Sequence, residues 1–418
     1  MNIKESISNA NSEALQKMNS VTPYLVDIKE AIEIIPGMTK NTILHAGPPI
    51  EWDKMCDPMK GAIAGILVYE NLVNTFKEGY EYAKDNLNFS PNHDLGVVGP
   101  MTGITAPHQP VFVLEDRETG KKSFCTLNEG RGKVLRFGGW DESVLTNLLW
   151  MKEILAPILK KAIVHSGGIN IKQLIAESLH MGDEAHNRNR SGTYLFLSQI
   201  LPHILDTETD HELIKEVIGF IVRNADIFHL NLSMPHSKLI ADAAREIEYC
   251  SLVVALARNG VETGIQVSGL GRKWFTSPAP LVSGLYFPGY SINDSCPDLG
   301  DSTITETIGL GGFSMANAPA IVNFVGGSSN DAIKRTEMMY EITAGRNTSF
   351  TIPILDFKTS PMGIDIRKVV ESNQPPLINT GISHKKAGIG QIGAGLTEAP
   401  LKMFIESLKA FAGKYNVN

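Results

Sequence analysis

The distribution of apolar residues divides the chain into three segments with different patterns. In the first, apolar residues recur at helical spacing over 61–84, and strand-forming residues are frequent over 95–100, 110–130 and 132–139. Gly120 lies in an ETGK turn between two strand-like runs, and glycine readily adopts the positive φ that hairpin turns require. The first third is therefore expected to mix helices with strands and to contain a hairpin.

From Asp141 onward, apolar residues recur every three or four positions, as they do on one face of a helix. Asp141 is placed to cap this helix, and Pro157 should interrupt it because proline lacks a backbone donor. Further helices are expected over 170–181, 190–205, 210–224 and 237–258, with Asn170 and Ser237 capping two of them. This second segment is predicted to form a helical domain.

After Gly260, glycine, proline and serine become frequent and short strands return. Strands or turns are expected over 264–271, 284–290, 318–327, 350–357 and 375–382, and helices near 331–343 and 399–413. The sequence thus predicts an α+β fold in which a helical subdomain lies between two mixed α/β lobes. The predicted domains are 1–140 (mixed α/β), 141–258 (helical) and 259–418 (glycine-rich, mixed α/β), and the third can interleave with the first.

Length and composition narrow the classes of protein. A chain of 418 residues is long enough for about two or three domains. Its 43% hydrophobic and 20% charged residues are typical of a soluble globular protein. The formal charge of −7 and the absence of a basic block argue against nucleic-acid binding. A few arginines can still bind a small anion, because their local field dominates at short range.

The chain is expected to be cytoplasmic, without a membrane partner. Its four cysteines are far apart and form no CxxC spacing, so neither a disulfide framework nor a zinc site is expected. The polar N-terminus lacks the apolar core of a signal peptide, and the longest apolar runs, such as 61–69, are shorter than a membrane span. The generous apolar content favours a homo-oligomer.

The densest polar cluster is HMGDEAHNRNRSG at 180–192. Its ionisable residues are His180, Asp183, Glu184, His186, Arg188 and Arg190. In one interpretation, carboxylates and imidazoles tune a general acid or base, or bind a divalent cation, while the arginines grip a carboxylate or phosphate. In the other, the cluster is a helix end neutralised by its own salt bridges. No HExxH string is present, and we expect no metal site.

Two further clusters combine glycine with polar side chains. In SGLGRKWFTSP (268–278), a glycine-rich turn precedes Arg272, which suggests anion binding, or else a strand connection anchored by Trp274. The segment 297–320 places Asp301, Ser302 and Thr303 before a GLGG turn. The amides of Gly311 and Gly312 are there predicted to face an anion, the alternative being a surface loop with hydroxyl-capped turns.

The glycine-rich segment 378–395 contains His384, Lys385 and Gln391. It suggests a closing loop or a phosphate cradle, or else a connector before the last helix; it lacks the GK[ST] of a Walker motif. No GxSxG elbow occurs and no cysteine lies beside a histidine in a known arrangement, so covalent catalysis is not expected. No cofactor is expected either.

These segments resemble a conserved, largely uncharacterised bacterial family that includes the AllG (YlbE) subunit of oxamate carbamoyltransferase. The resemblance runs from about residue 41 to the C-terminus. The strings that carry it are AGPPIEWD (46–53), EGRGKVLRFGGWDESV (129–144), HMGDEAHNRN (180–189), RNGVETGIQVSGLGRKWFTSPAP (258–280), GLYFPGY (284–290), PDLGDSTITETIGLGG (297–312) and NTGISHKKAGIGQIGAG (379–395). The S-x-R-T-R and H-P-x-Q strings of aspartate and ornithine carbamoyltransferases are absent, which implies an unrelated site.

The resemblance implies a part in the reversible phosphorolysis of oxalurate to oxamate and carbamoyl phosphate, during anaerobic allantoin (purine) degradation. It also implies an FdrA-like partner subunit and a third small subunit. From the chemistry of that reaction we expect His186, Asp183 and Glu184 to be catalytic. The residues expected to bind the anionic substrates (carbamoyl phosphate, phosphate, oxamate) are Arg188, Arg190, Arg272, Asp301, Ser302, Thr303, Gly311, Gly312 and Gln391. The alternative is a non-catalytic scaffold or anion-sensing partner of the FdrA-like subunit; another acyl or phosphoryl transfer on a ureido compound also stays open.

Overall fold

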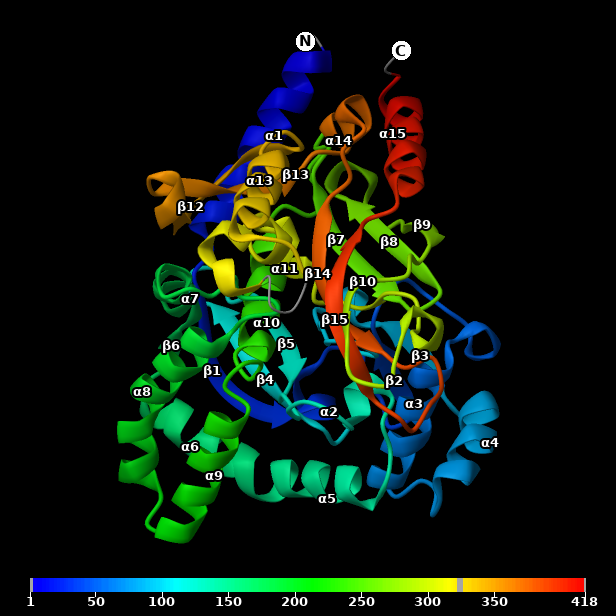
Figure 1. Cartoon of the computed structure of the whole chain (residues 1–418), viewed down its shortest axis with the longest axis vertical. Coiled ribbons are helices and arrows are strands. Elements are labelled where there is room, and N and C mark those ends of the chain that lie inside the picture. Colours follow the sequence, from blue (N-terminus) through cyan, green and yellow to red (C-terminus); the bar gives the residue numbers. More distant parts are fainter. Residues whose placement is uncertain (1–2, 322–325, 417–418) are drawn as a thin grey trace.

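The computed structural model describes residues 3–321 and 326–416, and it has the α+β composition predicted from the sequence (Figure 1). The helices are α1 (Ile3–Ser20), α2 (Ala31–Ile34), α3 (Asp57–Tyr69), α4 (Phe76–Asn86), α5 (Glu142–Trp150), α6 (Ala156–His165), α7 (Ile171–His180), α8 (Arg190–Thr207), α9 (His211–Arg223), α10 (Leu230–Asp242), α11 (Ile304–Thr307), α13 (Ser329–Met339), α14 (Ile366–Ser372) and α15 (Leu401–Tyr415). The strands are β1 (Pro23–Glu30), β2 (Thr42–His45), β3 (Asn88–Pro91), β4 (Pro110–Asp116), β5 (Lys122–Thr126), β6 (Ile169–Asn170), β7 (Val253–Asn259), β8 (Glu262–Val267), β9 (Phe275–Pro278), β10 (Ser283–Tyr286), β11 (Leu299–Gly300), β12 (Thr343–Ile352), β13 (Lys358–Ile364), β14 (Leu377–Ser383) and β15 (Gln391–Glu398).

The strands form several small sheets rather than one large sheet. Two four-stranded sheets have the orders β5-β4-β1-β6 and β11-β7-β8-β9, and a three-stranded sheet has the order β10-β15-β14. Their pairings are antiparallel, as is β12 with β13, whereas β2 and β3 pair in parallel. The largest hydrophobic cluster joins the first of these sheets to α1, α6, α7, α8 and α10.

The helical segment begins and is interrupted where the sequence predicts. The Asp141 side chain accepts a hydrogen bond from the Val144 amide at 3.1 Å, and the Asn170 side chain accepts one from the Gln173 amide at 3.1 Å. Both caps are therefore confirmed. Near Pro157 the helix changes to a π-helical turn over Met151–Leu155, after which α6 begins. The predicted hairpin is β4–β5, and Gly120 has the expected positive φ of 69°.

Two of the predicted strands are wrong. Residues 132–139 form a 3-10 turn over Leu135–Phe137 because Gly132 and Gly138 adopt positive φ, which a strand does not allow. Within 95–100, Leu95 ends the 3-10 turn Asn92–Leu95, Gly96 follows at positive φ, and Val97 forms an isolated bridge with Phe124. The stretch 318–327 lies partly outside the described residues, and 319–321 forms a 3-10 turn.

The predicted helix over 237–258 is also wrong. Helix α10 begins at Leu230 and ends at Asp242, and β7 begins at Val253. Ser237 is therefore no cap: it lies inside α10, where its hydroxyl donates to the Ser233 carbonyl at 2.6 Å. Every residue of β7 is buried, so the strand shows no alternation that would distinguish it from a buried helix.

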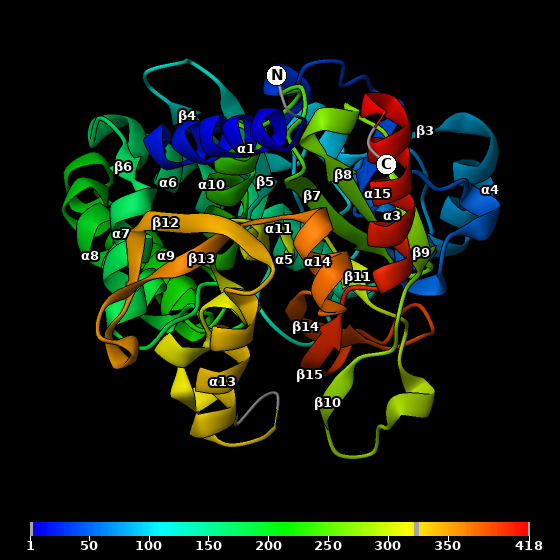
Figure 2. The same cartoon turned by 90° about the horizontal axis from the view of Figure 1, so that it is seen from above.

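Segments far apart in the sequence are tied together. Asn11 of α1 donates to Ser251 at 3.0 Å and to Asp365 at 3.2 Å, and Figure 2 shows α1 near β7 and β13. Strand β1 of the predicted first domain pairs with β6 of the predicted second domain. Strand β7 contains the predicted boundary at 258 and pairs with β8 of the predicted third domain. The three-domain division and the two-lobe arrangement stay predictions.

The four cysteines are free thiols. None of the helices in the described part of the chain is long and apolar enough to cross a bilayer.

Candidate active site

A cavity of about 250 Å³ lies among the loop over 131–137, the loop that precedes α8, the start of α10 and strands β10, β14 and β15. It is lined by Pro100, Met101, Arg131, Arg136, Phe137, His186, Asn187, Ile227, Leu230, Leu285, Tyr286, Phe287, Ser302, Gly381, Gln391 and Ala394. Three of the residues predicted from sequence, His186, Ser302 and Gln391, meet here. The described lining contains two arginines and no carboxylate, so its charge favours an anion.

His186 is held by a buried carboxylate behind it. Its Nδ1 lies 2.8 Å from Oε1 of Glu306, and both side chains are at most 2% exposed. Oε1 of Glu306 also accepts from the Gly312 amide at 3.1 Å, and Oε2 accepts from the Thr305 hydroxyl at 2.9 Å. An ionised Glu306 therefore fixes a proton on Nδ1, which leaves Nε2 as the ring atom that can exchange a proton in the cavity.

Glu184 and Asp183 shape the loop that carries His186. Oε1 of Glu184 accepts from the amides of His186 at 3.2 Å and Arg188 at 2.6 Å, and Oε2 accepts from the Asn379 side chain at 3.1 Å. Burial raises the pKa of Glu184, and the neighbouring His186 opposes the shift.

Asp183 accepts from the Gly192 amide in the first turn of α8 at 2.8 Å. Burial raises the pKa of Asp183 to about 7, although that hydrogen bond acts in the opposite direction. Neither Asp183 nor Glu184 lines the cavity, so they position the loop rather than face a ligand.

Arg136 presents a buried guanidinium to the cavity. Its residue is 6% exposed, and its side chain donates to the Gly130 carbonyl, while its Nε has no hydrogen-bond partner. Burial lowers the pKa of Arg136 to about 10, with Glu129 offsetting part of the shift, so the side chain stays charged at neutral pH. A buried cation with a free donor is a ready anion ligand.

Arg131 is the second arginine of the lining. Its Nη1 lies 3.2 Å from Asp226, whose other oxygen lies 2.8 Å from Nε of Arg190. Burial lowers the pKa of Arg131, with Asp226 opposing the shift. Arg190 therefore shares Asp226 with Arg131, and it does not line the cavity.

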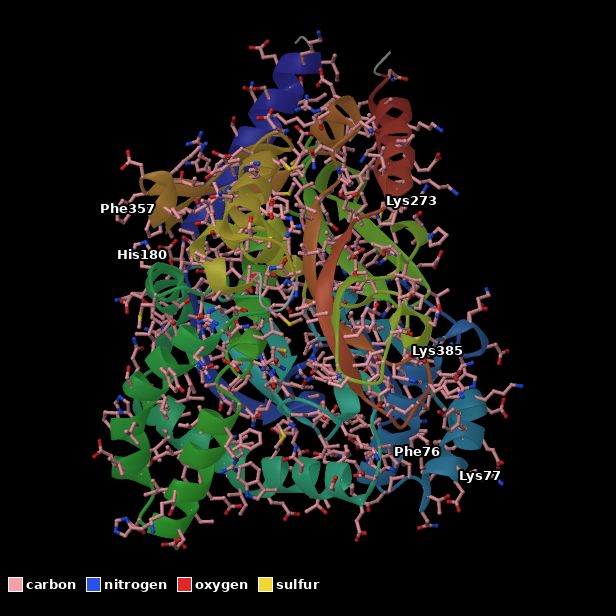
Figure 3. The ribbon with its side chains drawn as sticks, viewed as in Figure 1. Phe76, Lys77, His180, Lys273, Phe357 and Lys385 are labelled. Atoms are coloured by element: carbon pink, nitrogen blue, oxygen red, sulfur yellow. The ribbon has the colours of Figure 1, made fainter. Side chains whose placement is uncertain are left out.

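The other predicted arginines do not line the cavity. Nε of Arg188 donates to the Gly182 carbonyl at 2.9 Å, so this side chain folds back onto its own loop. Arg272 is exposed and lies 3.5 Å from Glu246. His180 lies on the outside of the molecule beside Phe357, with ring centroids 5.8 Å apart (Figure 3).

Of the residues 301–303, only Ser302 lines the cavity. Asp301 is buried and accepts from the amides of Gly47 and Gly99 and from the side chain of Asn92, at 2.8–3.0 Å. Burial raises its pKa to about 6, against these hydrogen bonds. Thr303 accepts from Arg258 at 2.9 Å, within a buried network that includes Asp298. Both side chains therefore fix the backbone around Ser302.

The predicted glycines, Gly311 and Gly312, lie next to the His186–Glu306 pair. The Gly311 amide donates to the Glu184 carbonyl at 2.8 Å, and a Cβ on Gly311 would lie 2.3 Å from Oε1 of Glu306. The Gly312 amide donates to Oε1 of Glu306. Gln391 lines the cavity and donates to the Gly393 carbonyl at 3.2 Å. Lys385 is exposed, does not line the cavity and donates to the Asn293 carbonyl at 2.5 Å.

Sequence reasoning missed Arg131, Arg136 and the role of Glu306. The two arginines lie in GRGKVLRFGG (130–139), of which we interpreted 132–139 as a strand, although four glycines flank them without an alternating pattern. That density of glycine beside arginine was the available signal. Nothing in the sequence paired Glu306 with His186, since the two are 120 positions apart.

Comparison with known proteins identifies relatives over almost the whole chain. The family described as oxamate carbamoyltransferase subunit AllG matches residues 87–302. The chain is 41% identical to the oxamate carbamoyltransferase subunit AllG of Escherichia coli K12, over 97% of this chain and 98% of that protein. It is 43% identical to the uncharacterized protein YahG of the same strain, over 99% of this chain and 88% of that protein.

A solved structure has the same fold. The crystal structure of a conserved protein of unknown function from Enterococcus faecalis V583 superposes with a TM-score of 0.96 and 44% identity, over 98% of this chain and 99% of that one. With the full-length identity above, these matches show that the chain belongs to the family of the oxamate carbamoyltransferase subunit AllG.

Proposed function

We propose that the chain is a cytoplasmic carbamoyltransferase subunit whose cavity binds a small anionic ureido compound together with carbamoyl phosphate or phosphate. The observation that carries the proposal is the convergence of Arg131, Arg136 and the Glu306-bound His186 on one cavity, among whose described lining residues there is no carboxylate. The name of the relative AllG supports oxamate as the carbamoyl acceptor, and carbamoylation of oxamate gives the ureido compound oxalurate.

The arginines would hold the negative charge of the substrates. The free Nε donor of Arg136 suits a carboxylate or phosphate oxygen, and Arg131 adds a second cation. The apolar lining, which includes Met101, Phe137 and Leu230, excludes water and strengthens both interactions. At about 250 Å³ the cavity is smaller than the pockets of roughly 300–1,000 Å³ that hold drug-sized ligands, as expected for compact substrates.

His186 would move the proton that accompanies carbamoyl transfer. In one direction the oxamate nitrogen attacks the carbamoyl carbon of carbamoyl phosphate, the carbon–oxygen bond to phosphate breaks, and Nε2 of His186 takes the proton from that nitrogen. In reverse, a phosphate oxygen attacks oxalurate, the carbon–nitrogen bond breaks, and Nε2 returns the proton to the leaving nitrogen. Glu306 stabilises the imidazolium that forms in the first direction.

The subunit is expected to act with partners. On the resemblance stated above, these are an FdrA-like subunit and a third small subunit, and the chain itself is expected to self-associate. Residues of a partner can complete the substrate site, since the isolated cavity is lined mainly by apolar groups.

The test combines binding and turnover. We expect isothermal titration of the isolated chain to show binding of carbamoyl phosphate or oxamate, and His186→Asn to abolish turnover of the reassembled complex while leaving this binding within a few-fold of wild type. Undiminished turnover with His186→Asn would contradict the proposal. Anion binding together with a complex equally active without this chain would instead favour the scaffold or anion-sensing alternative.

A further inference from the structure

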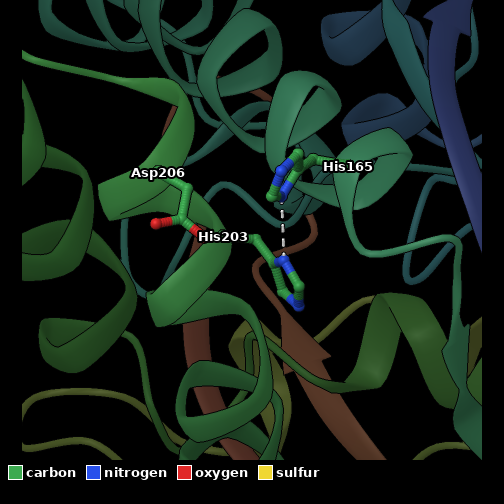
Figure 4. Close-up of side chains that lie close together, drawn as sticks. All are labelled: His165, His203 and Asp206. Atoms are coloured by element: carbon green, nitrogen blue, oxygen red, sulfur yellow. Dashed lines mark hydrogen bonds between the residues drawn. The ribbon is translucent and has the colours of Figure 1, made fainter.

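We propose that His165, His203 and Asp206 form a surface site for a divalent transition metal, with Zn²⁺ as its best match. Nδ1 of His165 and Nδ1 of His203 face each other at 3.0 Å (Figure 4). One ligand atom from each of the three residues lies within 4.8 Å of the others. None of the three lines the cavity described above, so the site is independent of the proposed carbamoyl transfer.

Two packed helices hold the three side chains together. His203 and Asp206 are three positions apart on α8, which places them on one face of that helix. His165 is the last residue of α6, where the free carbonyls of the helix end carry partial negative charge and favour a cation. Buried apolar residues of α6 and α8 belong to one hydrophobic cluster, so the packing of the protein core holds together the two helices that carry the histidines.

The spacing of the two nitrogens suits coordination. With Zn–N bonds of about 2.0–2.1 Å, two ligand nitrogens at a tetrahedral centre lie roughly 3.3 Å apart, close to the separation observed here. Asp206 is exposed, so its carboxylate can turn towards the same centre. The three groups would leave a fourth position for water.

The donor set selects the class of metal. Two imidazole nitrogens and one carboxylate favour Zn²⁺ and its transition-metal neighbours, whereas Mg²⁺ and Ca²⁺ prefer oxygen donors alone. The positive charge of Lys161, on α6 like His165, would repel a bound metal ion. Lys161 lies 3.4 Å from Glu208, whose negative charge compensates part of that repulsion. A bound ion would link the end of α6 to α8 at the edge of the helical layer.

The test is calorimetric titration of the full chain, stripped of metal by a chelator, with ZnCl₂ and separately with MgCl₂. We expect one Zn²⁺ per chain and at least about tenfold weaker binding in His165→Ala and in His203→Ala. The matched control is His211→Ala, which removes an exposed histidine of α9 outside the cluster and should keep wild-type affinity.

Thermal unfolding provides a second readout. Zn²⁺ should raise the Tm of wild type and His211→Ala but not of the two cluster variants, which without metal should unfold near the wild-type temperature. Failure of wild type to bind Zn²⁺, or equal affinity in wild type, His165→Ala and His203→Ala, would overturn the site. In the first case the 3.0 Å contact is an imidazole–imidazole hydrogen bond only, and in the second the ion binds elsewhere.

Discussion

Oε1 of Glu306 accepts a hydrogen bond from Nδ1 of His186 at 2.8 Å and a second one from the Gly312 amide. This geometry holds the imidazole in one orientation and one tautomer. A positioning role for Glu306 follows, because this carboxylate is buried behind the ring and does not line the cavity.

Replacing Glu306 by Gln should lower kcat of the reassembled complex by about 10²-fold or more with little change in KM, because an amide cannot stabilise the imidazolium. Steady-state kinetics over a range of pH is the measurement, and a shift in the pH profile distinguishes this role from simple loosening of the fold. Unchanged kcat with a native Tm would rule out the pairing as part of catalysis.

Replacing Arg136 by Met should weaken anion binding by about tenfold to a hundredfold, since a hydrogen bond to a charged group contributes roughly 1.5–3 kcal/mol. Titration with carbamoyl phosphate measures this loss of affinity. Because the variant leaves Glu129 buried without its cation, the double variant Glu129→Gln/Arg136→Met serves to restore stability while keeping the binding defect.

Arg272→Met is the matched control for that experiment. Arg272 is exposed and lies outside the cavity lining, so its removal should leave binding within about twofold, as for a surface charge. Loss of binding in Arg272→Met but not in Arg136→Met would support the arginine assignment made from sequence and reject the one made from the cavity.

Gly311→Ala should destabilise the fold and disturb His186. Its added Cβ would meet Oε1 of Glu306 at 2.3 Å, and Gly311 has a φ of 59°, so overpacking adds to backbone strain, together about 2–5 kcal/mol. Gly120→Ala, at a φ of 69° with no atom within 4 Å, carries the strain alone and should cost about 1–2 kcal/mol. Urea unfolding of both variants separates the two effects, and equal losses would refute the close contact.

The free energy of unfolding of Asp183→Asn, relative to that of wild type, should increase as pH rises from about 4 to about 7. The folded pKa of about 7 lies above the ordinary 3.8, so in this window the folded state binds the extra proton and loses stability as pH rises. Asn does not titrate, and a rise in the pKa from 3.8 to about 7 corresponds to a difference of about 4 kcal/mol for a fully buried group. Denaturant unfolding at several pH values measures the difference, and a constant value would contradict the raised pKa.

Local signals predicted much of the fold, and the failures have identifiable physical causes. The caps at Asp141 and Asn170 were predictable because each side chain bonds an amide three residues ahead. The start of β7 was not, because a fully buried strand and a buried helix both appear as an unbroken apolar run.

The candidate site was predictable only in part. His186 stood out as an imidazole among carboxylates, but its partner Glu306 comes from a distant segment and only tertiary contacts bring them together. Arg188 and Arg190 were prominent in the sequence, yet Arg188 donates to the Gly182 carbonyl and Arg190 forms an ion pair with Asp226. A run of charged residues in a sequence does not show which cationic side chains are already bonded to other groups in the fold.

The bonds from Asn11 to Ser251 and Asp365 constrain how the protein can be made. A ribosome adds about 5–20 residues per second, so the 354 positions between Asn11 and Asp365 take roughly 20–70 s to synthesise. During that interval the first helix emerges without its final acceptors, and chaperones have access to its uncovered apolar face.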